Sequence, residues 1–283
     1  MLTALVLISI LIGVLFYLPL AIFYFFMMLI CILAAWEWCP LAGFNKIYQK
    51  FMISSLFGMI LLLLAIHSWK NNLVVISTMI KLSLLLSLGW WILAFFLIIA
   101  YPDFTGFWRD SKILRLIFGM LTIVPFSAGI VVLRQFNYEV HHDTGAIYLL
   151  YIISLVVAVD SGSYVFGKFL GKHPFIPKIS PYKTWEGLVG GLLTSALIYY
   201  LFSLTTLQLP FKEWSMIILI VSIISVAASI LGDLTESMFK REAGIKESSN
   251  LLPGHGGVLD RIDSLTAAIP IFACLLLLFG KLR

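Results

Sequence analysis

The sequence predicts an all-α integral membrane protein, a polytopic bundle of about nine transmembrane helices that forms a single membrane domain over residues 1–283. Three observations lead to this prediction. The chain is 61% hydrophobic and only 12% charged. Its mean hydropathy of +1.04 exceeds what the core of a water-soluble protein requires. Its apolar residues fall into runs of roughly 20, the length that an α-helix needs to cross the hydrocarbon of a bilayer.

The apolar runs give nine candidate spans in order along the chain. They lie at about residues 2–17, 20–38, 52–69, 78–100, 113–134, 145–167, 187–205, 214–235 and 264–281. Only Pro19 separates the first two, so the alternative is one span over residues 1–38 and eight in all. The first run lacks the basic start and the small-residue cleavage site of a signal peptide, so we expect a retained helix.

Lysine and arginine gather in alternate loops. Thirteen of the 19 follow the second, fourth, sixth and eighth spans. The positive-inside rule therefore predicts that these loops and the N-terminus are cytoplasmic and that the C-terminus is external. Eleven of the 14 acids also lie on or near this face, although acids contribute little to orientation. A face dense in both signs indicates charged chemistry, with carboxylates to hold cations and basic groups to hold anions.

The first polar segment is VDSGSYVFGK, residues 159–168. Only about 14 largely apolar residues precede Asp160, so its carboxylate is expected within the thickness of the membrane. An acid in that position is costly and requires a partner or a water-filled cavity. Asp160 therefore either belongs to a functional site or fixes helix packing through a hydrogen bond to serine or tyrosine.

The second segment is PKISPYKTWEGLVGG, residues 177–191, which leads into the seventh span. Ser180 or Thr184 is expected to cap that helix, with Lys183 near its start. The unpaired backbone N–H groups of a helix start attract phosphate. The basic residues here suit either phosphate binding or a solvated surface that faces lipid headgroups.

The third segment is GDLTESMFKREAGIKESSNLLPGHGGVLDRIDS, residues 232–264. Residues spaced i, i+3, i+4 and i+7 share one face of a helix. If 232–241 is helical, that face carries Asp233, Glu236, Ser237 and Lys240. Asp260 and Asp263 repeat the three-residue spacing, so two acidic helix ends are predicted to converge. Such oxygen ligands suit Mg²⁺, which typically takes one or two carboxylates along with water and substrate phosphate; the other interpretation is a salt-bridged surface loop.

Part of this segment matches a known pattern. SMFKREAGIKESSNLLPGHGGVLDRID, residues 237–263, resembles the signature of the phosphatidate cytidylyltransferases, or CDP-diacylglycerol synthases: S-x-x-K-R, then K-D, then H-G-G-x-x-D-R-x-D. The resemblance also takes in AAWEW (34–38), LRLIFGMLTIVPF (114–126), DSGSYVFGK (160–168) and SPYKTWEG (180–187). It thus extends over most of the chain and points to the bacterial branch. One position departs, because Glu247 stands where the family usually has aspartate and its side chain is one methylene longer.

The resemblance implies the reaction CTP + phosphatidate → CDP-diacylglycerol + pyrophosphate, with Mg²⁺ as cofactor and room for a second cation. The nucleophile is a phosphate monoester, whose second pKa of about 6 leaves it mostly ionised near neutral pH. A strong general base is therefore unnecessary. The difficulty is repulsion between two anions, which positioning and charge neutralisation overcome.

The resemblance also implies roles for individual residues. Asp233 and Asp260 are expected first as metal ligands, with Asp263, Glu236 and Asp160 as further ligands or as groups that hold them. The residues expected to neutralise triphosphate and pyrophosphate charge are Lys240, Arg241, Lys246 and Arg261. The catalytic segments are thus expected as cytoplasmic loops at about 160–187 and 233–263.

Substrate-binding groups complete the expected site. Lys183, with Ser180 and Thr184, is expected to meet either the nucleotide or the phosphatidate headgroup, and Ser237 is expected to bind substrate as well. His255 either donates to phosphate or shapes the turn between its neighbouring glycines. Gly256 and Gly257 are expected to let backbone N–H groups approach phosphate oxygens.

The implied setting is the bacterial inner (cytoplasmic) membrane, with the active site facing the cytoplasm. The expected partners are CTP, phosphatidate, membrane lipid and a second copy in a homodimer, and no nucleic acid. The main alternative is an ion-coupled membrane transporter, which would also use an intramembrane acid such as Asp160. A concentration of charge on one face and the lack of a visible inverted repeat count against it. A noncatalytic scaffold is a further alternative, and it would tolerate Asp233→Asn and Asp260→Asn.

Overall fold

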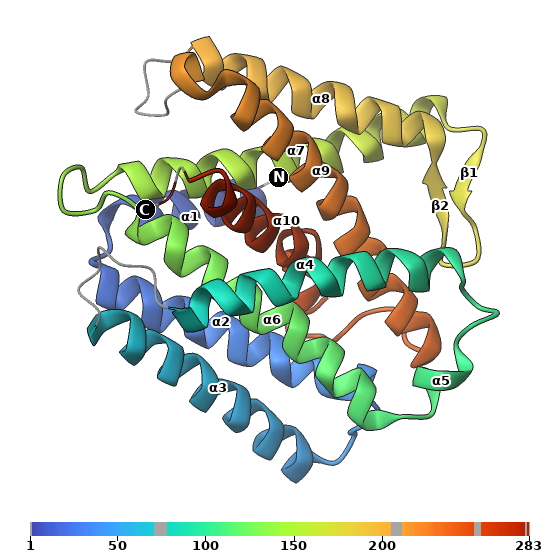
Figure 1. Cartoon of the computed structure of the whole chain (residues 1–283). Helices are drawn as coiled ribbons and strands as arrows, with labels where there is room; N and C mark the ends of the chain where they lie inside the picture. Colours follow the sequence, from blue (N-terminus) through green and yellow to red (C-terminus); the bar gives the residue numbers. More distant parts are fainter. Residues whose placement is uncertain (1, 71–77, 205–210, 252–255, 281, 283) are drawn as a thin grey trace.

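The computed structural model describes residues 2–70, 78–204, 211–251, 256–280 and 282, which form a helical bundle with one short β-hairpin (Figure 1). The helices are α1 (Leu2–Tyr17), α2 (Leu20–Leu41), α3 (Ile47–Lys70), α4 (Thr78–Ile99), α5 (Gly106–Arg109), α6 (Lys112–Gln135), α7 (Thr144–Leu170), α8 (Trp185–Leu204), α9 (Phe211–Glu242) and α10 (Leu259–Leu278). The antiparallel strands β1 (Pro174–Ile176) and β2 (Ser180–Thr184) form the hairpin between α7 and α8.

The prediction of an all-α polytopic membrane protein is confirmed. Within the described residues, eight helices are long and apolar enough to cross a bilayer. The first apolar stretch is two helices rather than one, because the chain breaks at Leu18 and Pro19. However, α1 has only 16 residues and is about 24 Å long, shorter than the hydrocarbon core of about 30 Å. The bundle thus has eight full-length spans and a shorter ninth helix.

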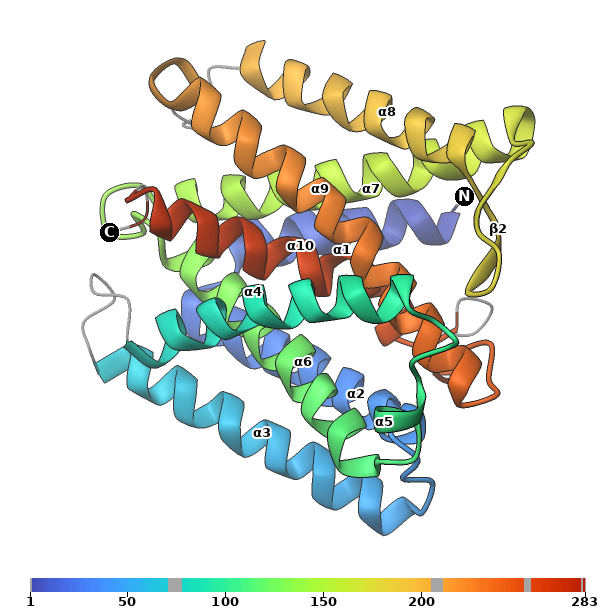
Figure 2. The same cartoon turned by 45° about the vertical axis from the view of Figure 1, so that its right-hand side comes forward.

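The helices run alternately in opposite directions, so four connections gather at one end of the bundle, on the right in Figures 1 and 2. These connections are 42–46, 100–111, 171–184 and 243–251, and we call this end the polar end. Figure 2 places the start of α1 toward the polar end and the C-terminal end of α10 at the opposite one. The grouping of basic loops predicted from the sequence is therefore present in the fold.

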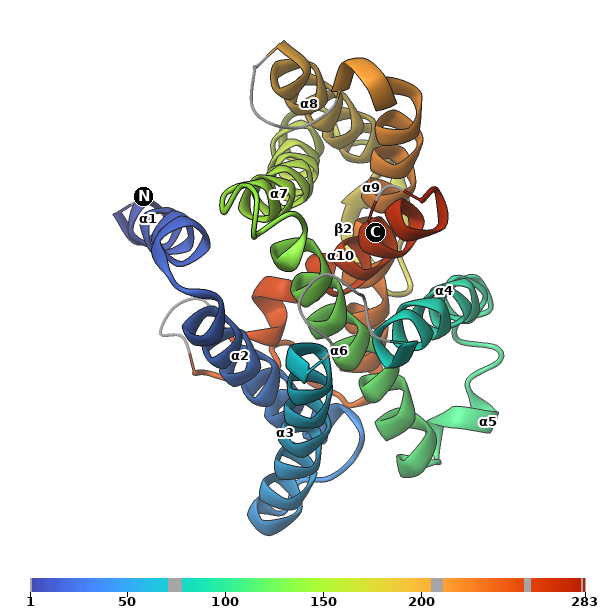
Figure 3. The same cartoon turned by 60° about the vertical axis from the view of Figure 1, so that its left-hand side comes forward.

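Two helices form the centre of the bundle, as Figure 3 shows from nearer its long axis: α6 and α10. Each has 61% of its span window buried, the largest share among the eight spans. Near the polar end, the buried ring of Phe239 on α9 packs between Trp38 of α2 and Trp108 of α5, with centroid separations of 5.2 and 5.0 Å. This packing stabilises the last turns of α9, where the charged residues lie.

Glycines let α7 and α8 approach each other closely over their halves nearest the polar end. A Cβ on Gly191 would lie 2.6 Å from the backbone oxygen of Val159 and would overlap the hydroxyl of Ser163. A Cβ on the neighbouring Gly190 would overlap the ring of Phe166. We call this contact the glycine seam; small residues of this kind allow close backbone packing between membrane helices.

The glycine seam predicts a specific loss of stability in Gly191→Ala. The new methyl group meets backbone, which cannot rotate away, so we expect a cost of about 1–3 kcal/mol and a lower Tm in detergent. Gly89→Ala on α4 is the matched control, because a Cβ there meets nothing within 4 Å and alanine favours the helix. Equal Tm values for the two variants would contradict a tight seam.

Candidate active site

Charged side chains from separate parts of the chain line one cavity at the polar end. It has a volume of about 370 Å³ and lies among α7, the hairpin, α8, α9 and α10. Four aspartates contribute to its wall: Asp160, Asp233, Asp260 and Asp263. Lys183 is the basic residue that lines it, and Leu188 and Ile230 give it an apolar side. We call it the acidic cavity.

Helix α9 carries the predicted polar stripe because it stays helical as far as Glu242. Ser237 donates to Asp233 Oδ1 at 3.3 Å, one turn along the helix. The other oxygen of Asp233 accepts from the Lys183 ammonium of β2 at 2.5 Å. The hairpin and α9 are thus joined at the cavity wall by an ion pair whose lysine remains 29% exposed.

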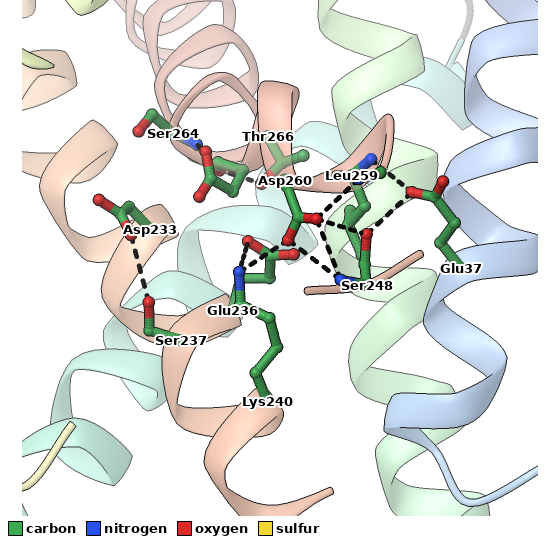
Figure 4. A network of polar contacts seen from close by, with 12 residues as sticks. Glu37, Asp233, Glu236, Ser237, Lys240, Ser248, Leu259, Asp260, Ser264 and Thr266 are labelled. Carbon is green, nitrogen blue, oxygen red and sulfur yellow. Dashed lines mark hydrogen bonds and ion pairs between the residues drawn. The ribbon is translucent and has the colours of Figure 1, made fainter. Parts of the chain in front are cut away.

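The two acidic helix ends converge through Lys240, as predicted (Figure 4). Its ammonium donates to Glu236 Oε2 at 3.1 Å on its own helix and to Asp260 Oδ1 at 2.8 Å on α10. The side chains of Lys240 and Glu236 are only 13% and 3% exposed. Lys240 therefore acts first as the internal counterion of two carboxylates, rather than as a cation presented freely to a triphosphate.

Asp260 is held on both sides by donors. Its Oδ2 accepts from Gly257 N at 2.8 Å and from the backbone N and hydroxyl of Ser248, each at 3.0 Å. The carboxylate thus ties Ser248 and Gly257 of the preceding segment to the first turn of its own helix. The Gly257 N–H predicted to meet phosphate is already donated to Asp260, so a phosphate would have to compete for it. Gly256 is buried beside it with φ +77°.

Glu37 of α2 belongs to the same network, although the sequence analysis gave it no role. Its carboxylate is 1% exposed and accepts four hydrogen bonds, of which Figure 4 shows those from Ser248 and Leu259. The donors are Ser249 Oγ at 2.6 Å, Ser248 Oγ at 3.1 Å, Val258 N at 3.0 Å and Leu259 N at 2.6 Å. The sequence did carry a feature that could have identified Glu37: it is an acid between two tryptophans near the end of an apolar span. Acids in such spans are usually functional.

The remaining predicted acids also reach this region. Ser264 donates its backbone N–H to Asp263 Oδ1 at 2.7 Å, and its hydroxyl lies 3.5 Å from Asp160 Oδ1 on α7. Asp160 is therefore part of the cavity shared with α9 and α10. Its contact with a serine hydroxyl also fits the packing role, so both interpretations of Asp160 stay predictions.

The hairpin places the predicted substrate-binding residues unequally. Thr184 caps α8 by accepting from Gly187 N at 3.2 Å, whereas Ser180 lies in β2, away from the helix start. Thr184 and Lys183 line the acidic cavity, and Ser180 is outside the described lining. The predicted cap at Thr184 is confirmed, and a cap at Ser180 is wrong because its residue lies in the strand.

The four basic residues of the signature, Lys240 included, lie outside the described lining of the acidic cavity. Arg241 donates Nε to the carbonyl of buried Ile179 at 3.0 Å, which ties the hairpin to the end of α9. Lys246 and Arg261 are exposed at the polar end. His255 lies outside the described residues. Roles for these groups toward phosphate stay predictions.

The predicted catalytic segments, 160–187 and 233–263, are only partly loops, because helices extend into both of their ends. Residues 160–170 belong to α7, 185–187 to α8, 233–242 to α9 and 259–263 to α10. The ion pairs and hydrogen bonds among their polar side chains allow the helices to continue through the site. A site built on helices holds its charged groups more firmly than one built on loops.

The residues of the cavity fit a divalent cation by charge and by donor type. Asp160, Asp233, Asp260 and Asp263 line the cavity, and Lys240 joins Glu236 to Asp260 beside it. Among the described residues, the ammonium groups that pair with these acids are those of Lys183 and Lys240. The second oxygen of Glu236, Oε1, is buried with no hydrogen-bond partner in the described structure. Oxygen ligands suit hard cations, although in the described part of the chain no three acidic, histidine or cysteine side chains already converge as a ligand set.

Comparison with known proteins gives matches over nearly the whole chain. The model of the "Cytidylyltransferase family" matches residues 1–279. A Haemophilus influenzae protein named phosphatidate cytidylyltransferase is 44% identical over 259 residues, 89% of this chain and 89% of the relative. A protein of the same name from Pseudomonas aeruginosa is 40% identical over 274 residues, 97% of this chain and 94% of the relative. One from Staphylococcus aureus is 45% identical over 143 residues, 50% of this chain and 54% of the relative.

Proposed function

The chain belongs to the cytidylyltransferase family, and from that premise we propose that the acidic cavity is its active site. The protein is a CTP:phosphatidate cytidylyltransferase, an enzyme of phospholipid biosynthesis that makes CDP-diacylglycerol. The alternative of an ion-coupled transporter is not supported, because the relatives that match over most of the chain carry the enzyme's name. The single observation that carries the site is the convergence of four aspartates and Lys183 on one cavity at the end of the membrane spans.

In the proposed reaction, a phosphate oxygen of phosphatidate attacks the α-phosphorus of CTP. A new P–O bond forms as the bond from the α-phosphorus to the bridging oxygen breaks, and pyrophosphate leaves with that electron pair. No proton has to be removed by the protein, because the attacking phosphate is already ionised. The protein must instead bring two anions together and hold them in line.

Lys183 is the residue best placed to bind a substrate phosphate. Its ammonium lines the cavity and remains partly exposed while Asp233 fixes its direction. Lys240 has the complementary role, because it offsets the charge of Glu236 and Asp260 and keeps both carboxylates in place. We propose that Lys246, Arg261 and His255 approach the triphosphate when it binds at the polar end.

We propose Mg²⁺ as the divalent cation of the site. Asp233, Asp260 and Asp263 would hold it, with Glu236 and Asp160 beside them, and Ser237 would steady Asp233. When bound, Mg²⁺ supplies positive charge that offsets the triphosphate and the developing pyrophosphate. A second cation in the same acidic cluster remains part of this proposal.

The cavity also suits a substrate that stays in the bilayer. Leu188 of α8 and Ile230 of α9 form its apolar side, next to the charged residues of its lining. We propose that the phosphatidate headgroup enters the cavity while its acyl chains remain in lipid, and that soluble CTP arrives from the polar end.

The protein is multi-pass and its named relatives are bacterial. We further propose that it lies in the inner membrane with its polar end in the cytoplasm. The concentration of basic residues at that end supports this orientation. A homodimer, implied by the family resemblance, is proposed as the working form.

The function is tested by following radiolabelled CTP into lipid. Purified protein in mixed micelles of detergent and phosphatidate is expected to transfer label to CDP-diacylglycerol and to release pyrophosphate, only when Mg²⁺ is present. Omission of phosphatidate and addition of EDTA are the controls. Folded protein that leaves all label in the aqueous phase would overturn the assignment.

A further inference from the structure

The carboxylate of Glu37 is buried, yet all four of its donors are neutral. They are two serine hydroxyls and two backbone N–H groups. A buried charge is tolerated only when hydrogen bonds replace its lost hydration. The N–H groups of Val258 and Leu259 belong to the start of α10, where the helix dipole also favours a negative charge. Glu37 thus satisfies donors at the start of a helix more than 200 residues away in sequence.

The same donors connect Glu37 to Asp260. Ser248 Oγ lies 3.1 Å from Glu37 Oε2 and 3.0 Å from Asp260 Oδ2, so a single hydroxyl stands between the two carboxylates. Gly257 packs against Glu37 and Ser248, since a Cβ there would lie 2.5 Å from Glu37 Oε2 and would overlap Ser248 Oγ. The carboxylates of Glu37 and Asp260 therefore both accept hydrogen bonds from the segments 248–249 and 257–259 and hold these segments together.

Asp260 has little freedom once these segments are fixed. Its Oδ2 is bound to Ser248 and Gly257, and this orientation leaves Oδ1 directed at the Lys240 ammonium, 2.8 Å away. Within the described residues, α2 enters this hydrogen-bond chain through the Glu37 side chain, which Figure 4 shows beside Ser248 and Leu259. A change at residue 37 is therefore transmitted to the acidic cavity through Ser248 and the first turn of α10.

We propose that Glu37 is a positioning residue for the cytidylyl transfer, one that holds Asp260 and its Lys240 partner in the acidic cavity from a neighbouring helix. The inference rests on the proposed function only for its effect on activity. Its structural part, the restraint of residues 248–249 and 257–259, can be measured without substrate.

Glu37→Gln is the discriminating variant because it keeps the size of the side chain. The amide nitrogen of glutamine is itself a donor, so it would face N–H or O–H donors that now meet a carboxylate oxygen. We expect kcat to fall about 10–100-fold, the range for residues that orient functional ligands. The KM for CTP should change much less, because Glu37 lies outside the described cavity lining.

Limited trypsin digestion in detergent provides the second readout. Lys246 is exposed two residues before Ser248, the first residue that Glu37 restrains, so cleavage after Lys246 should be several-fold faster in Glu37→Gln than in wild type. Glu139→Gln is the matched control, since Glu139 is exposed in the connection between α6 and α7, and Figure 1 shows that connection at the end of the bundle opposite the polar end. That variant should match wild type in both assays.

The outcomes separate the two proposals. Wild-type kcat and wild-type cleavage in Glu37→Gln would overturn the positioning role and leave the enzyme assignment intact. An inactive, folded wild type would overturn the proposed function, and the cleavage rates would then decide the restraint alone. If Glu37→Gln fails to fold, Ser249→Ala removes the 2.6 Å bond to Glu37 together with the 3.1 Å bond that Ser249 accepts from Leu251 N. Faster cleavage in it supports the inference and an unchanged rate overturns it.

Discussion

Asp260→Asn is expected to lower kcat/KM for CTP by about 10²–10³-fold, the loss typical of removing one preorganised electrostatic group from an active site. The carboxylate accepts from Lys240, Ser248 and Gly257 at once. An asparagine keeps the shape of the side chain, but its amide NH2 is a donor and would face at least one of the three groups that now donate to Asp260. It also removes the negative charge that Lys240 faces. The variant therefore loses a proposed metal ligand and the order of the segment before α10.

The matched control for this prediction is Asp103→Asn, the same chemical change at an exposed residue of the polar end. The rate of label transfer from CTP to lipid measures both variants. Asp103→Asn should retain the wild-type rate. If Asp260→Asn behaves like Asp103→Asn, Asp260 has no part in catalysis and the acidic cavity must be reassigned.

Lys240→Met is expected to destabilise the protein by about 3–5 kcal/mol, because it removes one partner of a buried ion pair and leaves the charge behind. In this protein two charges are left behind, on Glu236 and Asp260, whose side chains are 3% and 11% exposed. A fall of about 10 °C in Tm is expected for a chain of this size. Catalytic activity should be lost as well, since the carboxylates would repel each other.

A double variant separates the charge effect from lost packing. In Lys240→Met with Glu236→Gln, one of the two stranded charges is removed, so part of the Tm should return. Lys178→Met, at an exposed lysine of the hairpin turn, should leave Tm unchanged. A Tm for Lys240→Met equal to that of Lys178→Met would show that Lys240 does not stabilise the acidic pair.

The membrane spans could be read from the sequence because their boundaries coincide with changes in hydropathy. The run at 113–134 corresponds to α6 (Lys112–Gln135), and the run at 78–100 to α4 (Thr78–Ile99). The start of α10 was placed at 264 rather than Leu259. Hydropathy excluded the aspartates there, although partners such as Lys240 allow them to remain in a helix.

The site was predicted where the sequence spacing is local. The i, i+4 pairs Asp233–Ser237 and Glu236–Lys240 follow directly from helical periodicity. Glu37 could not be found in this way, since its contacts with Ser248 and Leu259 are 211 and 222 residues apart in sequence. The hairpin was expected as a loop for a similar reason, because Arg241 holds its turn from 62 residues away.

The glycine seam has a mechanical consequence. It locks α7 to α8 and to the strands between them, while Lys240 locks α9 to α10. The acidic cavity lies on the boundary between these two bodies and is lined by both. The Lys183–Asp233 ion pair and the bond from Arg241 to Ile179 already join these two bodies. A substrate that touches both Lys183 and Asp260 adds a further link between them, so the bundle should resist unfolding most strongly when both substrates are in place.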